Sequence, residues 1–256
     1  MKRRVVLAMV MLPFVQLMAQ QPDAGLIMSK SRDLSLTGSL SASINLTITE
    51  KNGANRKRTI SMTTKSFPEG VEKRFIKFIE PADVRGTAML VVDNKTTQDE
   101  MWIYLPALKK IRRIVSSEKG KSFMSSEFSN ADMSSPALSD FDNKHTPESG
   151  KNGQWVIESK PINEDKADEY GYSRKDSYIS IENYQIQKME FYNFDNELFK
   201  IIEIKSIHPL QDGKYLVNDM IAENLITNRK SEIVMTKISE GAKVDDSVFS
   251  LQNLER

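Results

Sequence analysis

Residues 81–133 read PADVRGTAMLVVDNKTTQDEMWIYLPALKKIRRIVSSEKGKSFMSSEFSNADM, and this stretch indicates the fold class. The runs 87–92 and 101–105 are short and rich in β-branched and aromatic residues, and the polar residues 93–95 between them are typical of a turn. Both runs place apolar side chains on both faces of the predicted hairpin. Both faces must therefore be covered, either by other parts of the chain or by a ligand.

Four motifs in this stretch carry a family resemblance. They are RGTA at 85–88, DEMWIYLPAL at 99–108, RRI at 112–114 and SFM at 122–124. In this order and spacing they resemble the outer-membrane lipoprotein-sorting family, the LolA/LolB-like periplasmic carriers. Ser125 stands where the family pattern has glycine, which costs backbone freedom, and Glu127 stands where it has aspartate, which keeps the charge.

The resemblance implies a mainly β fold with short α-helices, in which an antiparallel sheet curls into an incomplete (half) barrel and short helices plug its concave face. One LolA-like carrier domain is expected over residues 20–256, with an amphipathic helix at 22–33 across the open side of the sheet. Alternating apolar and polar residues, or apolar runs between turn signals, predict about eleven strands. Their expected ranges are 40–50, 57–65, 73–79, 87–92, 101–105, 154–159, 178–181, 186–194, 198–207, 215–224 and 232–238.

Residues 1–19 have the features of a cleavable signal peptide. Lys2, Arg3 and Arg4 precede an apolar run at 5–17, and Ala19 supplies a small residue before the expected cleavage site. The run is shorter than the ~20 apolar residues that a membrane-spanning helix needs. Cleavage would change the formal net charge from +1 to −2, and a near-neutral chain argues against nucleic-acid binding. We therefore expect an exported, periplasmic protein.

Few residues could support catalysis. The chain has no cysteine, which excludes disulfides, thiolate metal sites, cysteine nucleophiles and a lipid-modified cysteine, and so favours an unlipidated, LolA-like role over an anchored, LolB-like one. The two histidines, His145 and His208, lack a Gly-flanked serine elbow. Asp93, Asp99 and Glu100 lack the spacing of a calcium loop. We expect no enzyme activity, no catalytic residue, no metal and no cofactor.

A carrier of acyl chains needs an apolar surface, and methionine suits chains of varied shape. The alternation along 101–105 puts Trp102 and Tyr104 on one face of the strand. It puts Met101, Ile103 and Leu105 on the other face, and it leaves open which face is the cavity. The alternative is that all these side chains belong to an ordinary core. The expected cavity residues are Met89, Val91, Trp102, Tyr104, Met124, Met189 and Phe191.

The basic cluster Lys109, Lys110, Arg112 and Arg113 is the densest positive charge after the signal region. Arginine forks suit phosphate groups, so the cluster is a candidate docking patch for lipid phosphates or for an acidic membrane partner. The alternative is a solvated end of a hairpin.

The function implied by the resemblance is shuttling of lipid or lipoprotein acyl chains between membranes without covalent chemistry. The partners would be an inner-membrane transporter and an outer-membrane acceptor, and a monomer is expected. Burial gains about 0.8 kcal/mol per CH₂, so release of a long chain would need a coupled conformational change. The alternative function is an accessory or adaptor module of a resistance-nodulation-division-type exporter, and a hydrolase is a third class.

Overall fold

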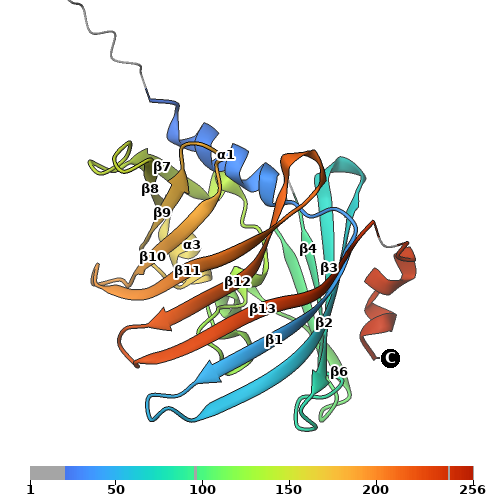
Figure 1. The fold of residues 1–256 in the computed structure, drawn as a ribbon. Helices are drawn as coiled ribbons and strands as arrows, with labels where there is room; N and C mark the ends of the chain where they lie inside the picture. Colours follow the sequence, from blue (N-terminus) through green and yellow to red (C-terminus); the bar gives the residue numbers. More distant parts are fainter. Residues whose placement is uncertain (1–20, 95–96, 242, 256) are drawn as a thin grey trace, which may run out of the picture.

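The computed structural model describes residues 21–94, 97–241 and 243–255, so the predicted signal peptide lies outside the described residues. One sheet of 13 antiparallel strands dominates the fold, as Figure 1 shows, and it is not closed into a barrel. The strands are β1 (Leu40–Thr49), β2 (Asn55–Phe67), β3 (Val71–Glu80), β4 (Ala88–Asp93), β5 (Glu100–Leu105), β6 (Lys110–Arg113), β7 (Phe141–His145), β8 (Gln154–Pro161), β9 (Arg174–Ser180), β10 (Ile186–Tyr192), β11 (Leu198–Pro209), β12 (Tyr215–Asn224) and β13 (Arg229–Glu240).

The helices are short. No helix in the described part of the chain has the length and apolar character that crossing a membrane requires. The α-helices are α1 (Ala24–Ser35), α2 (Ser116–Lys119) and α3 (Glu164–Tyr170). The 3₁₀ helices are η1 (Pro68–Gly70), η2 (Phe123–Ser125), η3 (Ala131–Met133), η4 (Leu138–Asp140), η5 (Gln211–Gly213), η6 (Asp246–Phe249) and η7 (Leu251–Glu255).

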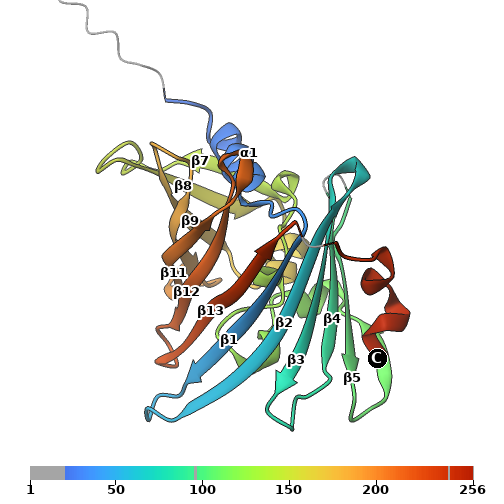
Figure 2. The same cartoon turned by 45° about the vertical axis from the view of Figure 1, so that its right-hand side comes forward.

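The order of strands in the sheet is β6-β5-β4-β3-β2-β1-β13-β12-β11-β10-β9-β8-β7. Strands that are neighbours in the sequence therefore pair, except β6 and β7, which form the two edges of the sheet. The pairing of β1 with β13 joins the two halves of the chain. The sheet is strongly curved. In Figure 2 the half of the sheet that contains β1 to β5 bends away from the half that contains β7 to β12. This arrangement confirms the predicted half-barrel.

Alternation along the strands separates a concave from a convex face. In β1, Leu40, Leu46 and Ile48 are fully buried on the concave side, while the intervening serines and threonines are more exposed. This is the half-exposed pattern that the sequence of 40–50 predicts. The main core therefore lies in the hollow of the sheet.

Residues 114–138, here called the plug, cross the concave face. The plug leaves the sheet at the edge strand β6, and the chain re-enters at the opposite edge through β7. Phe123 and Phe128 from the plug are buried in the same apolar cluster as Leu46 from β1 and Ile202 from β11. The plug therefore supplies core side chains that the concave face would otherwise lack.

A smaller core covers the convex face of β3 to β5. Phe249 and Leu254 of η6 and η7 pack there on Phe75 and Leu90. The C-terminal segment thus docks on the convex face of the sheet, while Leu251 at the start of η7 is 42% exposed. The two apolar faces of the hairpin at 87–105 are both covered, one by the plug and one by the C-terminal helices.

Candidate functional site

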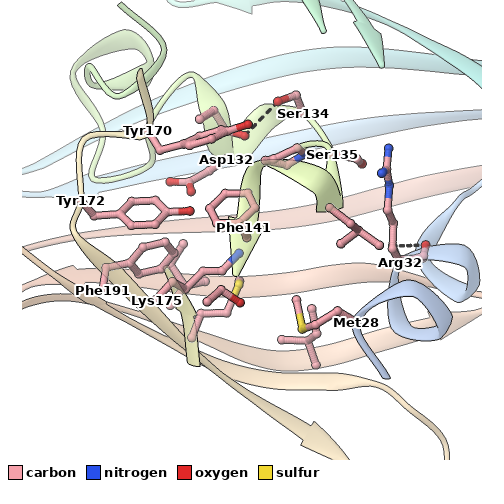
Figure 3. Close-up of a pocket in the computed structure, with 18 of the residues that line it drawn as sticks. Met28, Arg32, Asp132, Ser134, Ser135, Phe141, Tyr170, Tyr172, Lys175 and Phe191 are labelled. Carbon is pink, nitrogen blue, oxygen red and sulfur yellow. Dashed lines mark hydrogen bonds between the residues drawn. The ribbon is translucent and has the colours of Figure 1, made fainter. Parts of the chain in front are cut away.

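A cavity of about 200 Å³ lies between the concave face of the sheet and the segments that cover it. Strands β10, β11 and β12 contribute to its floor, and α1 and the plug contribute to its cover, as Figure 3 shows in part. Most of the lining is apolar. The apolar lining residues are Met28, Phe128, Ala131, Pro136, Leu138, Phe141, Ile186, Met189, Phe191, Ile202 and Met220.

Two polar pairs border the cavity. The Lys200 ammonium lies 2.8 Å from the Asp132 carboxylate, which also accepts a hydrogen bond from the Ser129 amide at 2.7 Å. The Tyr170 hydroxyl donates to Asp140 at 2.6 Å. Buried polar groups are tolerated when they are paired in this way. These pairs leave the space itself available to an apolar group.

Two further donors face the cavity, the Lys175 ammonium and the Tyr172 hydroxyl (Figure 3). Burial lowers the pKa of Lys175 to about 8; Lys200 adds to this shift by repulsion, while Asp132 opposes it. Burial and the nearby charge of Asp132 raise the pKa of Tyr172, which therefore stays a neutral donor at physiological pH. The cavity is thus mainly apolar, and Lys175 and Arg32 are the cationic residues in its described lining.

Basic residues of four strands hold the plug in place. Arg58 of β2 donates to the Met124 carbonyl, and Arg74 of β3 donates to the Met133 carbonyl. Arg229 of β13 donates to the Ser125 carbonyl at 2.9 Å, and Lys200 of β11 binds Asp132. Hydrogen bonds from charged donors are the stronger class. Despite its serine-rich sequence, the plug is therefore anchored to the sheet.

Replacing Ser125 with glycine is expected to stabilise the protein by about 1 kcal/mol. Ser125 has φ +63°, a left-handed conformation that side chains disfavour, at the position where the family pattern has glycine. The Arg229 bond to its carbonyl survives the change. Urea unfolding of Ser125→Gly measures the gain. The matched control, Ser134→Gly, alters a serine with φ −121° and should lower stability; a loss in Ser125→Gly would contradict the prediction.

Helix α1 covers the cavity through a few side chains. Asp23 caps its first turn by accepting from the Leu26 amide at 3.0 Å. Ile27 and Met28 are buried against Trp155 and its neighbours on β8 and β9. Near the helix start, the His145 ring bonds to the Pro22 carbonyl at 2.7 Å. No salt bridge of α1 occurs among the described residues. Compared with the plug, α1 is held mainly by apolar packing.

Comparison with known families shows to which family the chain belongs. A family model described as "-like: Uncharacterized protein" matches residues 70–256, which is well over half of the chain. The chain belongs to this family. No curated protein matches the sequence significantly.

Solved structures of LolA-like proteins share the fold of this chain. A domain described as an outer membrane lipoprotein-sorting protein from Vibrio parahaemolyticus is 24% identical, with a TM-score of 0.82 over 91% of this chain and 98% of that chain. A DUF1329 family protein from Desulfovibrio piger is 24% identical, with a TM-score of 0.80 over 90% and 97%. A LolA superfamily protein from Nitrosomonas europaea is 16% identical, with a TM-score of 0.69 over 91% and 100%. The resemblance seen in the sequence is confirmed, and the fold is LolA-like.

The structure of this protein brings together only part of the predicted set of cavity residues. Met189 and Phe191 line the cavity on β10. Met89 and Val91 lie on the concave side of β4, fully buried in the main core, and Met124 packs against that core from the plug. These three residues do not line the cavity.

Trp102 and Tyr104 lie apart from the others. They pack with the C-terminal helices in the convex cluster, whereas Met101 and Ile103 point into the concave core. Because side chains alternate along a strand, Trp102 and Tyr104 cannot share a face with Met89 and Val91 across the antiparallel β4–β5 pair in this register. The predicted set therefore combined residues from both faces of the sheet, and the concave face holds the cavity.

The basic cluster Lys109, Lys110, Arg112 and Arg113 lies exposed at the edge strand β6. Arg112 binds Glu118 at 2.6 Å and Arg113 binds Glu100 at 3.0 Å. Two of its four charges are thus already paired, which weakens the positive field of this edge. Its docking role stays a prediction.

Sequence reasoning missed Lys175, Tyr172 and Phe128 as cavity residues. The available signal was the alternation in 174–180, which places Lys175 on the opposite face from its charged neighbours Arg174 and Asp176. The described residues contain no group of three histidine and acidic side chains that could hold a metal ion.

Proposed function

We propose that the protein is a periplasmic carrier that takes up acyl chains of lipids or lipoproteins in the concave cavity and shuttles them between membranes without covalent chemistry. The observation that carries the proposal is the apolar cavity between β10–β12, α1 and the plug, in a fold shared with LolA superfamily proteins. Acyl chains ask for apolar area and little directional bonding. The lining meets that requirement.

Uptake requires the cavity to enlarge. Its volume of about 200 Å³ lies below the roughly 300–1,000 Å³ typical of small-molecule pockets. We infer that α1 moves to admit the chain, because α1 is held mainly by apolar packing, whereas the plug is anchored by charged hydrogen bonds. An incoming chain could replace the contacts that Met28 makes with the cavity. This assigns the movable cover to α1 and a fixed role to the plug.

The cellular setting is part of the proposal. The predicted signal peptide at 1–19 supports export. The proposal includes a single carrier domain over residues 20–256 that works as a monomer. The donor would be an inner-membrane transporter and the acceptor an outer-membrane protein. Lys109 and Lys110 at the sheet edge form no salt bridge within the described ranges, so they are the part of the basic cluster proposed to bind a phosphate or an acidic partner.

Native mass spectrometry of the protein, purified from cells without detergent, tests the proposal. We expect bound species whose masses match acyl compounds. Met189→Trp, which fills the cavity, should lose them. Met235→Trp is the matched control, because Met235 also packs on the concave core but does not line the cavity, and it should keep them. Protein free of acyl compounds in every form would favour the adaptor role instead.

A further inference from the structure

Strand β9 has charged residues on both faces of the sheet, two on the convex face and one on the concave face. On the convex face Arg174 lies 3.3 Å from Asp176 and 3.7 Å from Glu158. Lys175 lies on the concave face, between Ser159 of β8 and Phe191 of β10 in the register of the sheet. The convex charges are paired, so the unusual residue is Lys175.

The Lys175 ammonium has no anionic partner among the described residues. Neither a salt bridge nor a hydrogen bond of its side chain occurs there, and its ammonium lies over the Phe141 ring, 5.5 Å from the ring centre. An unpaired ammonium beside apolar walls is unfavourable, because it loses hydration without gaining a partner. Other basic residues of the concave face, such as Arg58, Arg74 and Lys200, avoid this cost by binding the plug.

Among the residues that the structure describes, a single carboxylate lines the cavity, and it is already engaged. Asp132 is bound by Lys200 and by the Ser129 amide. On the donor side, the Tyr172 hydroxyl and the Arg32 guanidinium also line the cavity, and neither has a hydrogen-bond or ion-pair partner among the residues of the described ranges. The described cavity lining therefore has more hydrogen-bond donors without partners than carboxylates free to accept from them. Such an excess of donors fits an anionic ligand.

We propose that the cavity binds an acyl chain with an anionic head group, a carboxylate or a phosphate, and that Lys175 binds this head group. The inference rests on the carrier function proposed above and narrows its cargo to acidic amphiphiles. The apolar lining from Met189, Ile202 and Met220 would hold the chain, and the Tyr172 hydroxyl would add a second donor to the head group.

Titration calorimetry of the delipidated protein with decanoate, decyl phosphate and decanol tests this inference at pH 7. We expect at least one of the two anions to bind roughly 10- to 100-fold more tightly than decanol, the range given by a hydrogen bond to a charged group. The anion that binds more tightly, decanoate or decyl phosphate, identifies the preferred head group. Lys175→Met should bind the anions as weakly as decanol, with decanol binding unchanged. Lys175→Arg, which keeps the charge, should retain the preference.

The control variant is Lys188→Met on the convex face, where Lys188 binds Glu190, and its preference should equal that of the wild type. The preference should also fade as the pH rises toward 10, as Lys175 loses its proton. The other titratable groups around the cavity in the described part of the chain are Asp132, Lys200, Arg32, Tyr172, Tyr170 and Asp140. Equal binding of decanol and both anions by the wild type would overturn the head-group inference while leaving the carrier function standing. Failure of all three compounds to bind would overturn both.

Discussion

Phe128→Ala is expected to lower the free energy of unfolding by about 3–5 kcal/mol, the usual cost of removing a large aromatic side chain from a core. Phe128 is completely buried in the main core and also lines the cavity. The plug around it is fixed by hydrogen bonds that Arg58 and Arg229 donate and by one that the Ser231 hydroxyl accepts from the Glu127 amide, so the chain cannot collapse freely into the space left behind. Urea denaturation followed by circular dichroism measures the change.

Phe194→Ala is the matched control for this measurement. Phe194 is 61% exposed in the turn after β10, so its removal should change the stability by less than about 0.5 kcal/mol. Equal small losses in both variants would mean that the plug is not part of the folded core. That result would contradict the plugged half-barrel.

Lys119→Met is expected to cost about 3 kcal/mol, the lower part of the range for breaking a buried ion pair. The Lys119 ammonium lies 2.6 Å from the Glu169 carboxylate, and both side chains are less than a tenth exposed. Removing Lys119 leaves Glu169 with Lys166 alone, at 3.0 Å. The pair joins α2 to α3 where Gly120 and Gly171 pack so closely that a Cβ on Gly120 would lie 2.8 Å from the Gly171 nitrogen.

A double variant separates the lost pair from lost packing. Lys119→Met with Glu169→Leu should recover most of the stability, because replacing both partners by apolar groups leaves no buried charge unpaired, and Lys166 keeps Asp140 at 2.8 Å. Lys121→Met, at an exposed site nearby, is the control and should be neutral. A double variant no more stable than Lys119→Met would contradict the ion-pair explanation. Thermal unfolding of all four proteins provides the comparison.

The interior strands of the sheet could be predicted because their side chains are sorted by burial. The strand β1 alternates clearly, and β4 and β5 are apolar on both faces because both faces are covered. The two strands that were not expected, β6 and β7, are the two edges of the sheet. Their sequences, KIRR and FDNKH, are polar and charged, which protects an edge from pairing with other chains but removes the apolar pattern that predicts a strand.

The plug and the cavity were harder to predict. The serines and turns of the plug resemble a loose loop, and only scattered apolar residues such as Phe123, Met124 and Phe128 hint at burial. Its anchors, such as Arg74 and Arg229, lie far away in the sequence, so no local pattern reveals them. Met189 and Phe191 could be assigned to the cavity from their apolar character. Lys175 could not be assigned in this way, because it stands out by lacking an anionic partner among the described residues. That lack depends on the three-dimensional arrangement.

The most direct test of the central claim is a crystal structure of the protein with 10-bromodecanoate, in which the anomalous signal of bromine locates the chain. The account predicts a bromine peak among the cavity side chains Met189, Ile202 and Met220, with the carboxylate beside Lys175 and α1 displaced outward. A bromine peak on the convex face beside Trp102, with the cavity and α1 unchanged, would contradict the account.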